Sequence, residues 1–197
     1  MATYHAIAAV GQAIVGLLKD ACPRDEFPNA QFELQSADDV TKAQLTEGVS
    51  IYLYRVMLDG AMRNRPPRLG LDGKRYRRSL PVNLYYLAIP WAKTALKQQV
   101  LLGWCMRTLE DVPILPSGLL NRDGFPDTFA IDEAVELFCE PLSLADINSV
   151  WDAFKPKIQI SAPYVARMVS IDSVVGVAET GPSAQTRAYN FGKVGVP

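Results

Sequence analysis

The chain has 197 residues, 49% of them hydrophobic, and a formal net charge of −1 at pH 7. This length and hydrophobic content predict a single globular domain with a sizeable core. The charge gives no global argument for binding to nucleic acid or to a membrane surface. The odd number of cysteines, at spacings that match no metal motif, indicates reduced thiols in a cytosolic protein rather than a disulfide framework.

The first segment, residues 3–21, is predicted to form a helix that ends before Pro23. Its apolar residues recur every three or four positions, as on the core-facing side of a helix. No lysine or arginine precedes Lys19, so the apolar run 6–18 lacks the basic region of a signal peptide. No apolar run reaches about 18 residues, and we therefore expect no membrane span.

Two runs of strand type, 48–56 and 80–89, are predicted to form the centre of a sheet. A shorter alternating run at 31–35 indicates an edge strand, and 37–47 a surface loop with a helical turn. In the first central run the side chains alternate between two faces. The expected sets are Val49, Ile51, Leu53 and the aliphatic part of Arg55 on one face, and Ser50, Tyr52, Tyr54 and Val56 on the other.

The second half continues with a predicted helix at 91–110, in which Gly103 indicates close packing against another backbone. The apolar stripe of this helix is predicted to be Leu96, Val100, Leu101, Trp104, Cys105 and Leu109. A loop at 117–131, a strand at 133–140, a helix at 143–154 and a strand at 164–171 follow. The helix at 143–154 begins with a variant capping box, because Ser143 stands three residues before Asp146. From residue 176 onward apolar density falls, which predicts a tail outside the core.

The connection between the two central runs is basic and far longer than the two to five or so residues that close a hairpin. Residues 63–78, which we call the basic arm, contain seven basic residues and one acid, Asp72, for a net charge of +6. Residues 123–140 contain six acids and no base, for a net charge of −6. A protein contact, a solvated loop and, because Tyr76 stands among arginines, a nucleic-acid contact remain open for the arm.

A catalytic constellation is missing from the sequence. There is no phosphate-binding glycine loop and no G-x-S-x-G motif, and His5 is the single histidine. The acids around Asp123, Asp127 and Asp132 do not match the calcium-loop pattern. We therefore expect no enzymatic activity, no cofactor and no metal site.

Several short phrases, taken in order, resemble one known family. It comprises the cap, or tail-terminator, proteins of phage-tail-like contractile injection systems, and the likeness is to their N-terminal domain over roughly residues 3–174. The order and spacing of the phrases carry the resemblance. The phrases are Tyr4 to Val10, Ile51 to Val56, Arg63-Asn64, Leu80 to Leu87, Leu101-Leu102-Gly103 with Met106 and Leu109, Pro113 to Leu115, Trp151, and Ser161 with Tyr164.

The resemblance implies an α/β (α+β) fold with a twisted, mostly antiparallel or mixed sheet and packed helices. It implies a cap domain over 1–175 followed by an extended tail over 176–197, whereas longer members carry a larger C-terminal extension. The implied function is a homohexameric ring on the baseplate-distal end of the inner tube and sheath, which ends polymerisation and anchors sheath to tube. The expected partners are other copies of the chain, the inner tube protein and the sheath protein, without nucleic acid. The location would be the cytoplasm during assembly and then the particle. The alternative is an adaptor whose basic arm binds nucleic acid or another acidic partner.

In a cyclic ring, each subunit presents one surface to each neighbour, so a head-to-tail contact repeats and closes. We therefore hypothesise that the arm's basic side chains bind an acidic surface outside their own subunit. The neighbour's residues 123–140 are one candidate surface, and an acidic rim of the tube or sheath is the other. The predicted partner-binding residues are Arg63, Arg65, Arg68, Lys74, Arg75, Arg77 and Arg78.

Overall fold

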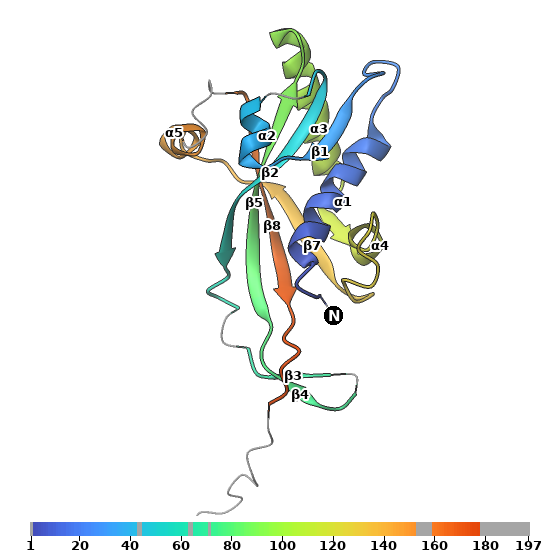
Figure 1. The fold of residues 1–197 in the computed structure, drawn as a ribbon, viewed down its shortest axis with the longest axis vertical. Helices are drawn as coiled ribbons and strands as arrows, with labels where there is room; N and C mark the ends of the chain where they lie inside the picture. Colours follow the sequence, from blue (N-terminus) through green and yellow to red (C-terminus); the bar gives the residue numbers. More distant parts are fainter. Residues whose placement is uncertain (1, 43–44, 63–64, 71, 153–158, 178–197) are drawn as a thin grey trace, which may run out of the picture.

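A computed structural model describes residues 2–42, 45–62, 65–70, 72–152 and 159–177. Five helices and eight strands are assigned within these ranges (Figure 1). In chain order they are α1 (Ala6–Ala21), β1 (Gln31–Leu34), α2 (Ala37–Lys42), β2 (Gly48–Leu58), β3 (Arg68–Leu69), β4 (Arg75–Tyr76), β5 (Leu80–Trp91), α3 (Ala95–Asp111), β6 (Ile114–Pro116), α4 (Ser117–Leu120), β7 (Ala134–Cys139), α5 (Leu144–Asp152) and β8 (Ala162–Ile171).

Six of the strands form one mixed sheet in the order β1-β2-β5-β8-β7-β6. Only β1 and β2 pair in parallel, and the other neighbours are antiparallel. The predicted central runs are β2 and β5, and the predicted edge strand is β1. The expected α/β class with a mostly antiparallel, mixed sheet is therefore confirmed.

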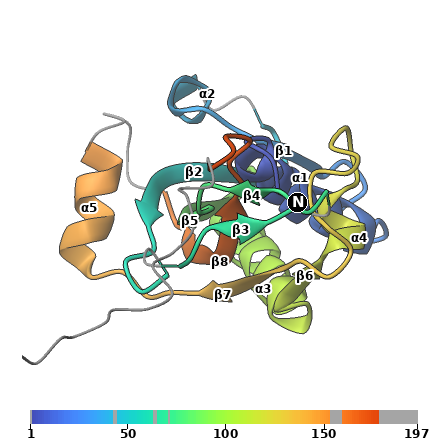
Figure 2. The same cartoon turned by 90° about the horizontal axis from the view of Figure 1, so that it is seen from below.

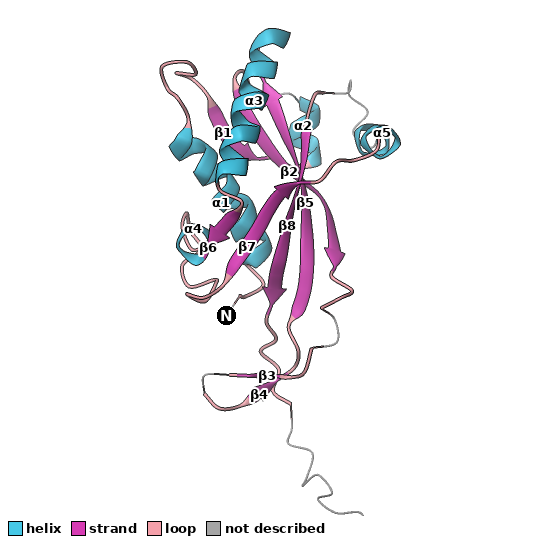
Figure 3. Ribbon diagram, turned by 180° about the vertical axis from the view of Figure 1, so that it is seen from behind, coloured by secondary structure: helices cyan, strands magenta, loops and turns pink. Residues whose placement is uncertain are grey.

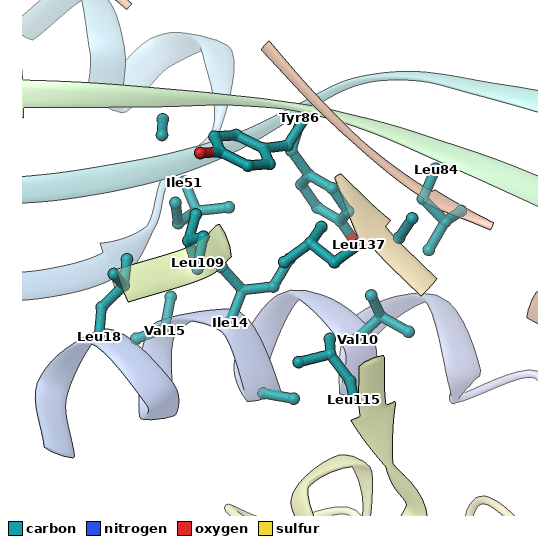
Figure 4. Close-up of a cluster of buried hydrophobic side chains, with 14 of the residues drawn as sticks. Val10, Ile14, Val15, Leu18, Ile51, Leu84, Tyr86, Leu109, Leu115 and Leu137 are labelled. Carbon is teal, nitrogen blue, oxygen red and sulfur yellow. The ribbon is translucent and has the colours of Figure 1, made fainter. Parts of the chain in front are cut away.

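The larger core lies between one face of this sheet and α1, α3 and α4. Figure 4 shows α1 side chains such as Ile14 and Leu18 directed at Ile51 and Tyr86 on the central strands. These four side chains are at most 2% exposed. Burial of large aliphatic and aromatic side chains stabilises a fold by about 1.5–3 kcal/mol each, so α1 holds the central part of the sheet.

A smaller core covers part of the opposite face, where α5 lies away from α1 and α4 (Figure 2). Trp151 of α5 and Val40 of α2 pack there with Leu87, Ile89 and Trp91 of β5. The hydroxyl half of the predicted capping box is confirmed, because the Ser143 hydroxyl accepts a hydrogen bond from the Asp146 N–H at 3.1 Å. The Asp146 carboxylate accepts from the same hydroxyl, at 2.7 Å.

The predicted alternation along β2 holds as far as Tyr54 and then reverses. Leu53 pairs with Tyr86, but Arg55 pairs with Tyr85, so Tyr54 is an extra residue in a β-bulge. Arg55 consequently stacks on the Tyr85 ring, 5.7 Å from its centroid. The expected faces for Arg55 and Val56 are therefore wrong, because an inserted residue shifts all later side chains by one position.

Helix α3 differs from its prediction in three respects. It begins at Ala95, because β5 continues to Trp91, whose indole N–H donates to the Ser50 hydroxyl at 2.7 Å. The Leu96 side chain, expected on the buried stripe, is 74% exposed. A Cβ on Gly103 would meet no atom within 4 Å, so the expected close backbone packing is also wrong.

Candidate partner-binding surface

The basic arm projects beyond the end of β5 and β8 farthest from α3, and its centre is a small hairpin of β3 and β4 (Figures 1 and 3). The Gly70 N–H donates to the Lys74 carbonyl at 2.8 Å, and Gly73 has a φ of 76° that suits glycine. Asp72 accepts from the Tyr76 hydroxyl at 2.7 Å and from the Lys74 N–H at 3.1 Å. A Cβ on Gly70 would overlap both the Asp72 carboxylate and the Tyr76 ring. The turn therefore depends on glycine and aspartate rather than on apolar packing.

The contacts of Asp72 affect the ionisation of both partners. The hydrogen bond from the Tyr76 hydroxyl, followed by that from the Lys74 N–H, lowers the pKa of Asp72. The same side-chain bond raises the pKa of Tyr76. The bond thus requires an ionised carboxylate and a protonated phenol, which coexist at neutral pH.

A second aspartate, Asp172, joins the hairpin to the body of the protein. Its carboxylate lies 3.4 Å from Arg68 Nε, an electrostatic contact longer than a good hydrogen bond, and accepts a hydrogen bond from the Ser79 hydroxyl. Its N–H donates to the Ala2 carbonyl at 2.8 Å. The Arg68 guanidinium in turn lies 5.2 Å from the centroid of the Tyr76 ring. Asp172 therefore links the arm and the start of β5 through its carboxylate, and the N-terminal segment through its backbone N–H.

The chain segment after β8 pairs with the free edge of β4. The Arg77 N–H donates to the Val175 carbonyl at 2.9 Å, and the Val177 N–H donates to the Arg75 carbonyl at 2.8 Å. Gly176 lies opposite Tyr76 between these two bonds. Residues 175–177, which we call the docking segment, thus add one antiparallel β-bridge to the edge of the hairpin. Most of the predicted tail, 178–197, lies outside the described residues.

The structure separates the seven predicted partner-binding residues into groups. Arg63 lies outside the described residues. Arg68 is half-buried and paired with Asp172 of its own chain. Lys74 and Arg75 are exposed on the hairpin. The role of these side chains in binding outside the subunit stays a prediction.

The remaining three arginines line one cleft of about 780 Å³ beside the docking segment. Pro67, Ser173 and Val177 complete the described part of its wall, which contains no acidic residue. The lining arginines are Arg65, Arg77 and Arg78. This cleft brings together three of the arm's arginines.

Some acids of the stretch 123–140 have partners within their own chain. Glu140 pairs with Arg167 at 3.6 Å, and Glu133 accepts a hydrogen bond from the Ala130 N–H. Asp132 and Glu133 line a pocket of about 190 Å³ together with Arg65 of the same chain. The base of the arm therefore faces part of its own acidic stretch, an arrangement that the linear charge pattern does not reveal.

Neither His5 nor Cys105, two groups with catalytic potential, lines the basic cleft. His5 precedes α1 and has its ring 4.1 Å from that of Tyr4 and 6.1 Å from that of Phe125. Burial raises the pKa of the Cys105 thiol to about 12, so it is not a thiolate at neutral pH. Across the described ranges no group of three or more His, Cys, Asp or Glu side chains is placed to hold a metal ion. Every helix within those ranges is too short or too polar to cross a membrane.

The sequence did not predict the two contacts that position the arm, namely the docking segment and Asp172. The available signal for the docking segment was the β-branched run Val174, Val175 and Val177 directly after the last strand. Asp172 had no comparable signal, because a lone acid at the end of a strand is common in loops.

Comparison with known proteins places the chain among injection-system terminators in fold. A solved structure described as the sheath/tube terminator of an extracellular contractile injection system, PVC, in the extended state matches with a TM-score of 0.62 and 14% identity. The match covers 96% of this chain and 65% of that one. The tube-terminating cap of the anti-feeding prophage, AFP, matches with a TM-score of 0.59 and 14% identity, over 92% of this chain and 60% of the other.

The chain thus spans less than two thirds of the length of both solved terminators. A search of curated proteins finds no match. The family model described as the Pvc16 N-terminal domain matches residues 9–185, which is most of the sequence. The chain therefore belongs to the Pvc16 N-terminal domain family.

Proposed function

We propose that this protein is a structural cap that terminates the inner tube and sheath of a contractile injection system. The observation that carries the proposal is the family match over residues 9–185, together with a fold shared with a sheath/tube terminator and a tube-terminating cap. Its place would be the baseplate-distal end of the particle, where it stops polymerisation and holds sheath to tube.

The assembled form would be a homohexameric ring that contacts the inner tube protein and the sheath protein. The projecting arm supports this proposal, because a charged hairpin held away from the core can reach a neighbouring molecule. Individual exposed ion pairs contribute only about 0–1 kcal/mol, so the arm's charges would act together around the ring. The protein would assemble in the cytoplasm and then remain part of the particle.

The proposed role is non-enzymatic. The deeply buried Cys105 and the peripheral His5 form no nucleophile–base pair among the described residues, which supports a structural role. Purified protein should show no hydrolase or transferase turnover that survives repurification. A turnover abolished by His5→Ala would contradict this part of the proposal.

Electron microscopy of particles made with and without this protein tests the cap function. Particles that lack it should have tubes and sheaths of irregular length, and expression of the intact chain should restore a uniform length. A ring on the tube end opposite the baseplate should be visible only in the restored sample. Uniform particles in its absence would refute the proposal.

A further inference from the structure

The docking segment leaves one backbone edge open. In an antiparallel pair, residues alternate between hydrogen-bonded and non-hydrogen-bonded positions. Gly176 lies between the two bonds that Val175 and Val177 make to β4, so it occupies a non-hydrogen-bonded position. Its own N–H and C=O therefore point away from β4. Among the described residues none bonds to either group.

The basic cleft lies at this same segment. Val177 and Ser173 line it, together with three arginines and no described acid. A further strand paired at the Gly176 edge would place alternate side chains, about 7 Å apart, on the same face. A strand with acidic side chains on that face would set carboxylates against guanidinium groups, which pair strongly and with defined geometry.

We propose that the docking segment and the basic cleft together bind an extended acidic segment of a partner protein by strand addition. The backbone of the partner would bond to Gly176, and its carboxylates would pair with Arg65 and Arg77. This inference rests on the proposed cap function, which would place the partner in the particle. The binding itself can be measured with the purified chain, because the docking segment and the cleft both belong to it.

The geometry favours a peptide over a nucleic acid. The described lining of the cleft contains no aromatic ring on which a base could stack. Tyr76, the aromatic residue among the arm's arginines, lies under Arg68 and donates its hydroxyl to Asp72. The Gly176 N–H and C=O can pair with the C=O and N–H of a peptide backbone. A phosphodiester backbone has acceptor oxygens but no N–H or O–H that could donate to the Gly176 carbonyl.

Gly176 allows the strand pairing to be tested separately from the charge. Gly176→Pro removes the outward N–H but leaves the bonds of Val175 and Val177 to β4. Gly176→Ala is the matched control, because a Cβ there would meet only the Arg75 carbonyl, at 3.9 Å. Arg65→Gln with Arg77→Gln tests the charge, with Arg107→Gln on α3 as an exposed control far in sequence.

The assay is fluorescence anisotropy of the full chain with labelled ten-residue peptides in which valine alternates with glutamate or with lysine. The glutamate peptide should bind at least about tenfold more tightly than the lysine peptide and should weaken as salt rises. Gly176→Pro and the double arginine variant should each weaken it about five- to tenfold, since each removes one of the two recognition elements. The two control variants should bind within about twofold of the original chain, because they leave both elements intact.

Equal binding by Gly176→Pro and Gly176→Ala would overturn strand addition, and equal binding by the double arginine variant would overturn the role of the cleft. If an oligonucleotide binds more tightly than the peptide, and its affinity is unchanged in Gly176→Pro, the site binds nucleic acid and the proposal is wrong. If the peptide fails to bind while the chain still restores particle length, only this inference fails. If the peptide binds and particle length does not depend on the chain, the proposed cap function fails instead.

Discussion

The two ends of the central strands are held by different kinds of interaction. Toward α1 and α3, β5 carries Leu84, Tyr86 and Ala88 into a core where each is at most 2% exposed. Beyond the start of β5, the arm depends on Asp72, Asp172 and short backbone pairings, while Leu69 on β3 is 67% exposed. Burial of apolar side chains stabilises the fold but does not fix an orientation, because the hydrophobic effect is non-directional. A few hydrogen bonds and ion pairs fix the orientation of the arm but add little net stability. The covered end is the scaffold from which the arm projects.

The largest effect on stability should come from the covered end. Leu84→Ala should lower the free energy of unfolding by about 2–5 kcal/mol, because it removes a fully buried side chain and leaves a cavity. Urea unfolding followed by circular dichroism measures the change. Leu69→Ala in the arm is the matched control and should change stability by less than about 0.5 kcal/mol. Similar losses in both variants would remove the distinction between the two regions.

A smaller effect should follow from loss of the carboxylate that joins the regions. Asp172→Ala should cost about 1–3 kcal/mol, because Arg68 loses its ion-pair partner and the Ser79 hydroxyl loses a charged hydrogen-bond acceptor. Hydrogen exchange at Gly70 and Arg77 should become faster as the hairpin loosens. Asp111→Ala breaks the exposed Arg107–Asp111 pair instead and should cost no more than about 0.5 kcal/mol. Unchanged exchange in Asp172→Ala would show that the arm is positioned by other contacts.

Charge reversal in the arm should leave stability nearly unchanged and still prevent assembly. Arg75→Glu, Arg77→Glu and Arg78→Glu alter exposed positions, so thermal unfolding should shift little. Ring formation, or docking on the tube end, should fail because the contact surface changes sign. Mass photometry and particle length measure these outcomes. The control variant carries Lys19→Glu and Lys93→Glu, two changes at exposed lysines elsewhere on the surface. Normal capping by the arm variant in both low and high salt would show that the arm is a solvated loop.

The smallest effect is the pH response of the hairpin turn. The pKa of Asp72 is lowered, so its contribution is present above the ordinary carboxyl value near 4 and is lost as pH falls through the folded value. The pKa of Tyr76 is raised, so its contribution is present below about 10 and is lost as pH rises through the folded value. In Asp72→Asn, an NMR titration should find the Tyr76 pKa shifted down toward its ordinary value. An unchanged Tyr76 titration would show that the bond to Asp72 does not form in solution.

Part of the candidate surface follows from the sequence because charge density is a local property. The seven basic residues of 63–78 identify the arm without knowledge of the fold. The cleft formed by Arg65, Arg77 and Arg78 does not follow, since it also needs residues 173 and 177 from the other end of the chain. The proximity of Arg65 to Asp132 and Glu133 likewise depends on how the loop before β7 lies against β5 and β8.

The sequence alone predicted β2, β5 and α1, because apolar residues recur every two positions in a strand and every 3.6 in a helix when one face is buried. The Ser143–Asp146 cap was equally visible, since its partners stand three residues apart. The bulge at Tyr54, the exposure of Leu96 and the pairing of Gly176 with Tyr76 were decided only by the tertiary structure. Each depends on a neighbour distant in sequence, and hydrogen bonds or packing between distant segments leave no periodic pattern in either segment alone.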